Sequence, residues 1–435
     1  MQSSNLPFVD ASPTPVPLSQ QEPHDLLKTW SLALAQLVSW GTVYYSFSLF
    51  VVPMEHAMGW SRASLNAALS LGLLVSGFAA LPVGRWIDAG YGRRVMVVGS
   101  ALSGAMLLLW AYVNWLPILF VVWFGLGLSM SATLYDPVFA VITHRYPLTY
   151  RAKITLITLV AGFASTVFIP LTGWLVNVWG WRATLIVLAV ANLTVCLPIH
   201  AAAMPSSRGA GARKSAEVDH KSTDAVSIAR ALRSITFWAL LICFTAYYAV
   251  FAGMTFHLVP LLKERGVPTA VMLTVMAMVG PAQVVARAAW YVFGRALPMT
   301  TLGIIVVLAL PLSVLLLMAV STSAWGLMGF ALLYGAANGM MTILRGTAIQ
   351  ELLWTQGYGA LSGMLSMPSN LAKGLAPIAV AGVWSITMTY GPAEYVFLLL
   401  ALVATAAFAI AARYSGREVQ LPSLHPTRDD AAPHA

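Results

Sequence analysis

The sequence predicts an all-α membrane protein in which twelve transmembrane helices form two six-helix repeats. Of its 435 residues, 59% are hydrophobic and only 9% are charged, whereas a soluble domain carries about 25% charged residues. Twelve apolar runs have roughly the 20 residues that a helix needs to cross the ~30 Å hydrocarbon core. Similar residues also recur in the two halves at a nearly constant offset. Together these observations indicate that the protein's solvent is lipid.

Each apolar run is expected to be a helix, because a backbone in lipid must satisfy its own hydrogen bonds. In chain order the runs are 30–53, 65–84, 95–113, 117–142, 154–178, 183–203, 238–262, 271–294, 302–322, 325–353, 358–384 and 393–412.

A single long polar stretch, 204–235, separates the first six runs from the last six and predicts a cytoplasmic linker. The ends of the chain are polar, and the first is rich in proline, which is typical of disorder. We therefore expect a disordered cytoplasmic tail, an amino-terminal bundle, a carboxyl-terminal bundle and a second cytoplasmic tail. Their boundaries are 1–27, 28–203, 236–413 and 414–435.

The distribution of positive charge predicts the orientation, because Lys and Arg concentrate in cytoplasmic loops. With the amino terminus inside, the outer loops hold only Arg62, Arg182, Lys263 and Arg265. The net charge of +9 is dispersed over short inner loops and does not indicate nucleic-acid binding. We expect a multi-pass monomer in the cell (inner) membrane, with both termini in the cytoplasm.

Similar residues occur at corresponding positions in the two halves of the chain. Pro53 and Gly84 recur as Pro260 and Gly294, at offsets of 207 and 210 residues. This pattern indicates a parallel duplication of a six-helix unit, and it predicts a binding site at the midplane between the halves.

Residues 84–94 form a short loop between the second and third runs, with the sequence Gly-Arg-Trp-Ile-Asp-Ala-Gly-Tyr-Gly-Arg-Arg. It resembles the signature loop of the major facilitator superfamily, in which Gly, three residues and Asp precede Gly-Arg-Arg or Gly-Arg-Lys. The resemblance implies a secondary transporter. It also implies that Gly84, Asp88, Arg93 and Arg94 belong to an inward gate.

Two cations lie deep within predicted helices: Arg287 in the eighth and Lys373 in the eleventh. An ionised side chain at this depth costs at least ~2.5 kcal/mol, so each should face a polar cavity or a partner. The sequence offers no acid at comparable depth beside them, and a bound organic anion would relieve their repulsion. The alternative is that either side chain snorkels or binds helix carbonyls.

This pair resembles the oxalate/formate antiporter and the wider monocarboxylate transporter branch. There an arginine of the eighth span and, in the antiporter, a lysine of the eleventh clamp a carboxylate. Proton-coupled members of that branch carry an aspartate four residues before the arginine, where this chain has Gln283. A glutamine cannot carry a proton as that aspartate does. Exchange of one substrate for another, or a proton route through other residues, is therefore more plausible than proton transfer at position 283.

Asp136 and Arg345 lie in the fourth and tenth spans. The superfamily resemblance implies that Asp136 pairs with Arg93 or Arg94 in the gate; alternatively, it is a proton site. Arg345 lies nearer the cytoplasmic end than Arg287, and a gate or salt-bridge role is as plausible as contact with substrate.

Polar and aromatic residues also recur on one face of the first helix and on the seventh. The resemblance implies that they line the cavity, and helix packing is the alternative. The residues are Gln36, Trp40, Tyr44, Tyr45 and Tyr248.

The leading hypothesis is a secondary transporter that moves a small mono- or dicarboxylate by alternating access, with a proton or a counter-substrate as the coupling species. One alternative is a proton-driven exporter of hydrophobic drugs or metabolites, in which Asp136 would titrate. Another is a membrane sensor that does not transport. We find no Walker loop, metal cluster or nucleophile–base motif, so we expect neither an enzyme nor a cofactor.

Overall fold

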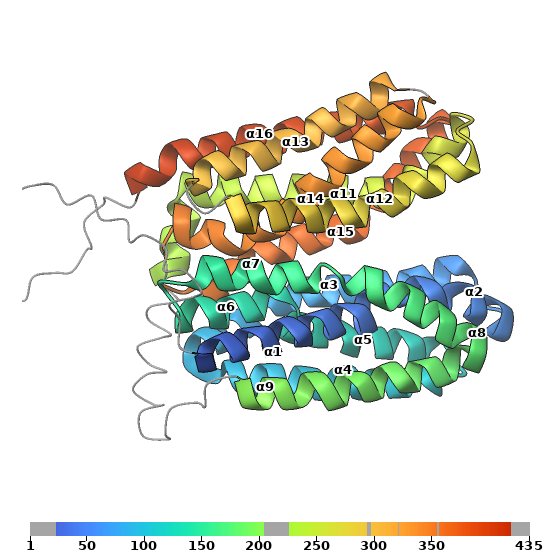
Figure 1. Cartoon of the computed structure of the whole chain (residues 1–435), viewed down its shortest axis with the longest axis horizontal. Coiled ribbons are helices and arrows are strands. Elements are labelled where there is room, and N and C mark those ends of the chain that lie inside the picture. Colours follow the sequence, from blue (N-terminus) through green and yellow to red (C-terminus); the bar gives the residue numbers. More distant parts are fainter. Residues whose placement is uncertain (1–22, 204–225, 294–296, 321, 355, 419–435) are drawn as a thin grey trace, which may run out of the picture.

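The computed structural model describes residues 23–203, 226–293, 297–320, 322–354 and 356–418, and these residues are almost entirely helical. The helices lie in two bundles that run side by side along the long axis of the molecule (Figure 1). Residues 23–203 form one bundle and residues 235–418 form the other. The tails expected at 1–22 and 419–435 and the linker at 204–225 lie outside the described residues.

The amino-terminal bundle contains six crossings, several of them interrupted by a π-helical turn or a kink. Its elements are α1 (Pro23–Ser39), η2 (Trp40–Tyr45), α2 (Phe47–Met58), α3 (Arg62–Trp86), η3 (Ile87–Tyr91), α4 (Gly92–Ala111), α5 (Leu116–Thr133), α6 (Tyr135–Arg145), α7 (Tyr150–Ala161), α8 (Ala164–Ala191), η4 (Asn192–Cys196) and α9 (Leu197–Ala203).

The carboxyl-terminal bundle contains six longer helices. They are α11 (Ile235–Glu264), α12 (Thr269–Phe293), α13 (Met299–Ala319), α14 (Ala324–Leu352), α15 (Tyr358–Thr387) and α16 (Gly391–Glu418).

Nine helical runs in the described chain are long and apolar enough to cross a membrane. Two of them, 62–111 and 150–203, are 50 and 54 residues long, about twice the length that a single crossing needs. The chain reverses inside them at Gly90 and Gly180, whose positive φ angles of 85° and 75° favour glycine. With α15, which is too polar to be counted among the nine, these runs supply the twelve crossings of the predicted fold.

Two predicted boundaries were wrong by a short distance. Helix α1 begins at Pro23, so residues 23–27 are helical rather than part of the tail. Residues 226–233, which we expected in the linker, also form a helix, and Ala231 within it is fully buried. Both segments are polar enough to resemble loops in the sequence, and the second one buries Ala231 and Ser227 against its bundle.

The bundles meet where α3 packs against α15. At Gly363 a Cβ atom would lie 2.6 Å from the carbonyl oxygen of Ala80, and at Gly84 it would strike the backbone of Gly359. Small residues therefore let two helix backbones approach closely. The contact extends from Gly84 to Leu74, whose side chain reaches Gly374.

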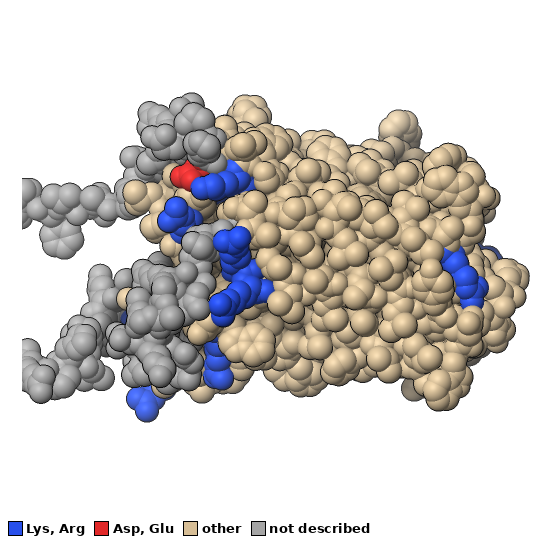
Figure 2. Space-filling view, turned by 90° about the horizontal axis from the view of Figure 1, so that it is seen from below, with Lys and Arg blue, Asp and Glu red and all other residues tan. Residues whose placement is uncertain are grey.

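Figure 2 shows Lys and Arg side chains gathered at one end of the molecule, with an uncharged belt in the middle. We call this the basic end. It carries the start of α1 and the turns that join α3 to α4 and α6 to α7. Its cations include Lys28, Arg85, Arg93, Arg94, Arg145 and Arg151.

Candidate functional site

Arg287 of α12 lies buried between the bundles, with 4% of its surface exposed. Its Nε donates to the carbonyl of Gly339 at 2.9 Å and its Nη2 to Thr342 Oγ1 at 3.3 Å. Its Nη1 crosses the boundary between the bundles and donates to the carbonyl of Thr158 at 3.1 Å. In the described chain it has no carboxylate partner.

These contacts hold the Arg287 guanidinium without neutralising it. A guanidinium carries five N–H donors, and the three hydrogen bonds use three of them. The other two donors have no hydrogen-bond partner among the described residues. Arg287 thus binds helix carbonyls, which was the alternative to an anion site, and its binding of an anion stays a prediction.

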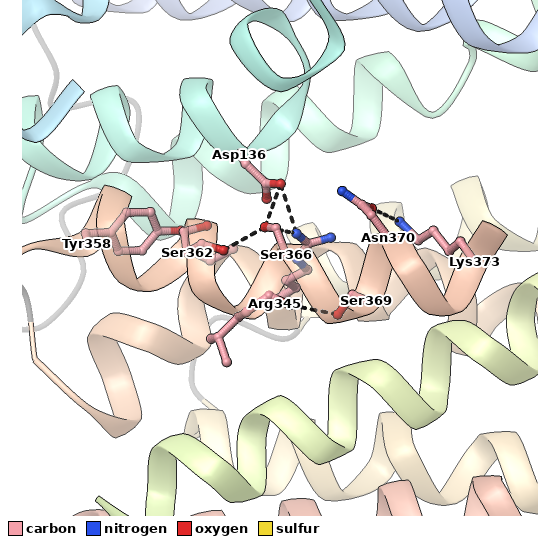
Figure 3. Close-up of polar contacts among 10 residues, drawn as sticks. Asp136, Arg345, Tyr358, Ser362, Ser366, Ser369, Asn370 and Lys373 are labelled. Atoms are coloured by element: carbon pink, nitrogen blue, oxygen red, sulfur yellow. Dashed lines mark hydrogen bonds and ion pairs between the residues drawn. The ribbon is translucent and has the colours of Figure 1, made fainter. Parts of the chain in front are cut away.

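Lys373 of α15 lies on the same side of the boundary as Arg287. Its Nζ donates to Asn370 Oδ1 at 3.3 Å and lies 4.1 Å from the centre of the Tyr248 ring. It forms no ion pair with any residue that the structure describes, although its charge interacts with those of Arg345 and Asp136. Figure 3 shows Lys373 and Asn370 together on α15.

Tyr248 of α11 lies among all three cations. Its ring is 4.1 Å from Lys373 Nζ and 5.4 Å from the guanidinium carbon of Arg345. The charge of Arg287 also reaches its hydroxyl. The predicted site residues Tyr248, Arg287 and Lys373 are thus brought together by three different helices of one bundle.

Arg345 of α14 forms an ion pair with Asp136 of α6, with Nη2 and Oδ2 separated by 2.9 Å (Figure 3). Ser366 of α15 donates to the same carboxylate oxygen at 2.9 Å and also contacts Arg345. The implied pairing of Asp136 with Arg93 or Arg94 was wrong. The first turn of α6 faces the other bundle, so the carboxylate meets α14 and α15 instead of the signature loop.

Asp88 of the signature loop caps the amino terminus of α15. Its two carboxylate oxygens accept the backbone N–H groups of Gly359 and Ala360 at 2.9 and 2.8 Å. His144 Nε2 lies 2.7 Å from Oδ1. The carboxylate therefore satisfies free N–H groups at the positive end of a helix dipole in the opposite bundle.

Gly84 and Asp88 both take part in this contact at the basic end. Arg94, by contrast, is exposed and lies 5.9 Å over the ring of Tyr91, and Arg93 is half-buried. A further link between the bundles was missed from the sequence: Glu351 of α14 bonds both Tyr150 and Arg151 of α7. Glu351 stands at the end of an apolar run, where the sequence gives no sign of a partner.

Among the described residues, the hydrogen bonds and ion pairs that join the two bundles have a common location. They run from Arg287 and Asp136, near the middle of their crossings, to Asp88 and Glu351 at the basic end. The bundles are therefore fastened together on the basic side of the midplane.

The aromatic residues predicted on the first helix form a cluster on the amino-terminal bundle. The ring of Trp40 lies 5.2 Å from Tyr44 and 4.9 Å from Tyr135, and Tyr44 lies 5.3 Å from Tyr45. The chain adopts a π-helical turn here, η2, which is common at functional sites. Tyr135 was not predicted, because it precedes Asp136 in a different span.

Gln36 has a different position. It is fully buried, and its Nε2 donates to the carbonyl of Thr133 within the same bundle. Its side chain thus packs inside the amino-terminal bundle, which was the alternative reading of this helix face.

Comparison with known proteins agrees with this architecture. The model of the Major Facilitator Superfamily matches residues 32–377. A curated relative, monocarboxylate transporter 13 of Bos taurus, is 24% identical over 364 residues, which cover 80% of this chain and 81% of the relative.

Solved structures resemble the fold over nearly their whole length. The proton:xylose symporter XylE gives a TM-score of 0.66 at 11% identity, covering 90% of this chain and 96% of that one. The human organic anion transporter MFSD10 gives 0.65 at 15% identity, covering 90% and 100%. The fucose:proton symporter FucP of E. coli gives 0.65 at 12% identity, covering 92% and 100%.

Proposed function

Because this chain belongs to the Major Facilitator Superfamily of membrane transporters, we propose that it carries a small organic anion, a mono- or dicarboxylate, by alternating access. The observation that carries the proposal is Arg287. It is a buried cation with two free donors and no carboxylate partner in the described chain. A carboxylate fits such a guanidinium because two parallel N–H···O bonds match its geometry.

The charges around the site support an anionic ligand. Asp136 is already paired with Arg345, and neither Arg287 nor Lys373 forms an ion pair with any described residue. Two buried positive charges repel each other in a medium of low dielectric constant. A bound anion stabilises both, so the charge of the site favours anion binding on electrostatic grounds. The similarity to a monocarboxylate transporter points to the same ligand class.

The contacts at the basic end supply the gate of this cycle. At that end Asp88 caps α15, and Glu351 pairs with Arg151. Asp136 pairs with Arg345 deeper, near the middle of the crossings, and all three contacts hold the bundles together on the basic side of the midplane. We place the basic end, with both chain termini, in the cytoplasm of the cell membrane, on the principle that cationic loops stay inside. The arrangement then corresponds to a monomer closed toward the cytoplasm, and transport requires these contacts to break.

Coupling is proposed to be exchange with a second anion. Gln283 stands one helical turn before Arg287 on α12, on the same face, and an amide does not release a proton at physiological pH. A counter-anion can instead replace the outgoing carboxylate and keep Arg287 compensated as the protein changes conformation.

A ligand screen by thermal unfolding tests the proposal. A ligand that binds only the folded state at 100 times its Kd stabilises it by about 2.7 kcal/mol. Mono- and dicarboxylates are compared with neutral amides of the same shape on the purified protein and on Arg287→Gln. We expect a carboxylate to raise the Tm of the wild-type protein and to leave that of the variant unchanged. Stabilisation by neutral, hydrophobic compounds alone would favour an exporter of such compounds instead.

A further inference from the structure

We infer that the organic anion carried at this site contains an aromatic ring, so that its carboxylate binds Arg287 while its ring packs on the aromatic cluster of the amino-terminal bundle. We define that cluster as Trp40, Tyr44, Tyr45 and Tyr135. The inference rests on the proposed function and narrows its substrate class to aryl carboxylates.

The cluster and Arg287 face the same region between the bundles. Tyr135 of the amino-terminal bundle directly precedes Asp136, whose carboxylate pairs with Arg345 of the opposite bundle at 2.9 Å, and Arg345 lies 5.4 Å from the ring of Tyr248. The charge of Arg287 also acts on Tyr45 and Tyr135. Tyr135 also interacts in this way with Tyr248 of the opposite bundle. The four cluster side chains are partly exposed although they lie in the middle of their crossings. Part of their surface is therefore not covered by other side chains.

The four rings of the cluster are partly exposed and pack mainly on one another. Tyr248 already has Lys373 and Arg345 over its ring, whereas in the described chain no cation lies over any ring of the cluster. Tyr135 is covered on one side by Phe139, which stacks on it at 5.3 Å with an interplanar angle of 14°. Trp40 packs against Tyr135 with an interplanar angle of 42°. The two rings are therefore tilted relative to each other and not stacked in parallel.

The cluster is also held rigidly before any ligand binds. The π-helical turn η2 places Trp40, Tyr44 and Tyr45 on the exposed side and buries Gly41, Thr42 and Val43. A Cβ atom at Gly41 would strike the ring of Phe168 on α8, so only glycine allows this close approach. A preorganised aromatic surface loses little conformational entropy on binding.

An aromatic ring gains more from this surface than a saturated ring of similar size. Aromatic pairs in tilted or edge-to-face geometry contribute beyond the area that they bury. Benzoate is therefore expected to bind roughly 2- to 10-fold more tightly than cyclohexanecarboxylate. Acetate and oxalate reach Arg287 but leave the cluster uncovered, and both are expected to bind more weakly than benzoate or phenylacetate.

The test measures binding of benzoate, phenylacetate, cyclohexanecarboxylate, acetate and oxalate to the full-length protein, by calorimetry in detergent. Tyr45→Leu removes a ring from the cluster, Tyr45→Phe keeps it, and Trp325→Leu removes a ring that is 83% exposed elsewhere. We expect Tyr45→Leu to abolish the preference for benzoate over cyclohexanecarboxylate. Tyr45→Phe and Trp325→Leu should retain it.

The outcomes separate this inference from the proposed function. If acetate or oxalate binds as tightly as the aryl carboxylates and depends on Arg287, the site takes anions and the aromatic inference is wrong. Equal binding of benzoate and cyclohexanecarboxylate by the wild-type protein also overturns it, and this comparison needs no variant to fold. If no carboxylate binds at all, the proposed function itself fails.

Discussion

Asp136 and Arg345 form an ion pair of 2.9 Å between the two bundles. Their side chains are 28% and 12% exposed, so the pair is screened less than one on the surface. Ser366 donates to the same carboxylate and connects the pair to α15. Three helices from two bundles thus meet at one carboxylate, and separating the bundles at the basic end must break this contact.

Neutralising Asp136 should favour the conformation that is open at the basic end. Asp136→Asn keeps the shape but removes the charged partner of Arg345, at a cost between that of a surface pair and that of a buried one, about 1 to 3 kcal/mol. Spin labels at Leu148 and Gln356, both exposed at the basic end, should report a longer distance. Cys196 and Cys243 are buried and should not compete for the label.

The matched control is Glu55→Gln, which removes the exposed Arg62–Glu55 pair inside one bundle. It should leave the distance distribution unchanged. The same distribution in Asp136→Asn and in the wild-type protein would mean that the pair does not hold the bundles closed.

Removing the carboxylate of Asp88 should loosen the first turn of α15. Asp88→Ala eliminates the acceptors of the Gly359 and Ala360 amides, which as a lost helix cap costs about 0.5 to 2 kcal/mol. Hydrogen exchange at those two amides should accelerate, and the distance between labels at the basic end should increase. Asp88→Asn, which retains an acceptor, should have a smaller effect of the same sign. Unchanged exchange in both variants would contradict a gating role for Asp88.

Adding a methyl group where α3 meets α15 should prevent closure. At Gly84 a Cβ atom would collide with the backbone of Gly359, whereas at Gly382 it would meet nothing within 4 Å. Gly84→Ala should therefore abolish transport while the protein stays folded and monodisperse, and Gly382→Ala should transport normally. Normal transport by Gly84→Ala would show that close contact of these helices is not required.

The twelve crossings and the repeat could be predicted from the sequence, because hydropathy and the recurrence of residues can be read along the chain. The close approach of α3 and α15 at Gly84 was not predicted. The partners of the charged residues could not be predicted either. Asp136 meets Arg345 209 positions away, and only the packing of α6 against α14 and α15 brings them together. His144 and Glu351 were missed for the same reason, and the π-helical turn at Trp40 has no local sequence signal that we recognise.

Exchange should drive transport better than a proton gradient. In liposomes loaded with a carboxylate identified by the thermal screen, uptake should exceed that into empty liposomes with an acidic exterior, since Gln283 cannot relay a proton. Strong acid-driven uptake without internal substrate, lost in Asp136→Asn while exchange is preserved, would overturn this prediction. Asp136 would then be the coupling site.

The central claim is that Arg287 and Lys373 bind the substrate anion, and the most direct measurement is carboxylate uptake by liposomes containing Arg287→Gln or Lys373→Gln. Arg62→Gln, which removes an exposed cation, is the matched control. Losing a charge-assisted contact in a buried site costs at least ~2 kcal/mol, so each site variant should lose about 30-fold or more in uptake efficiency while remaining folded. Uptake at the wild-type rate and affinity by both site variants would contradict the account.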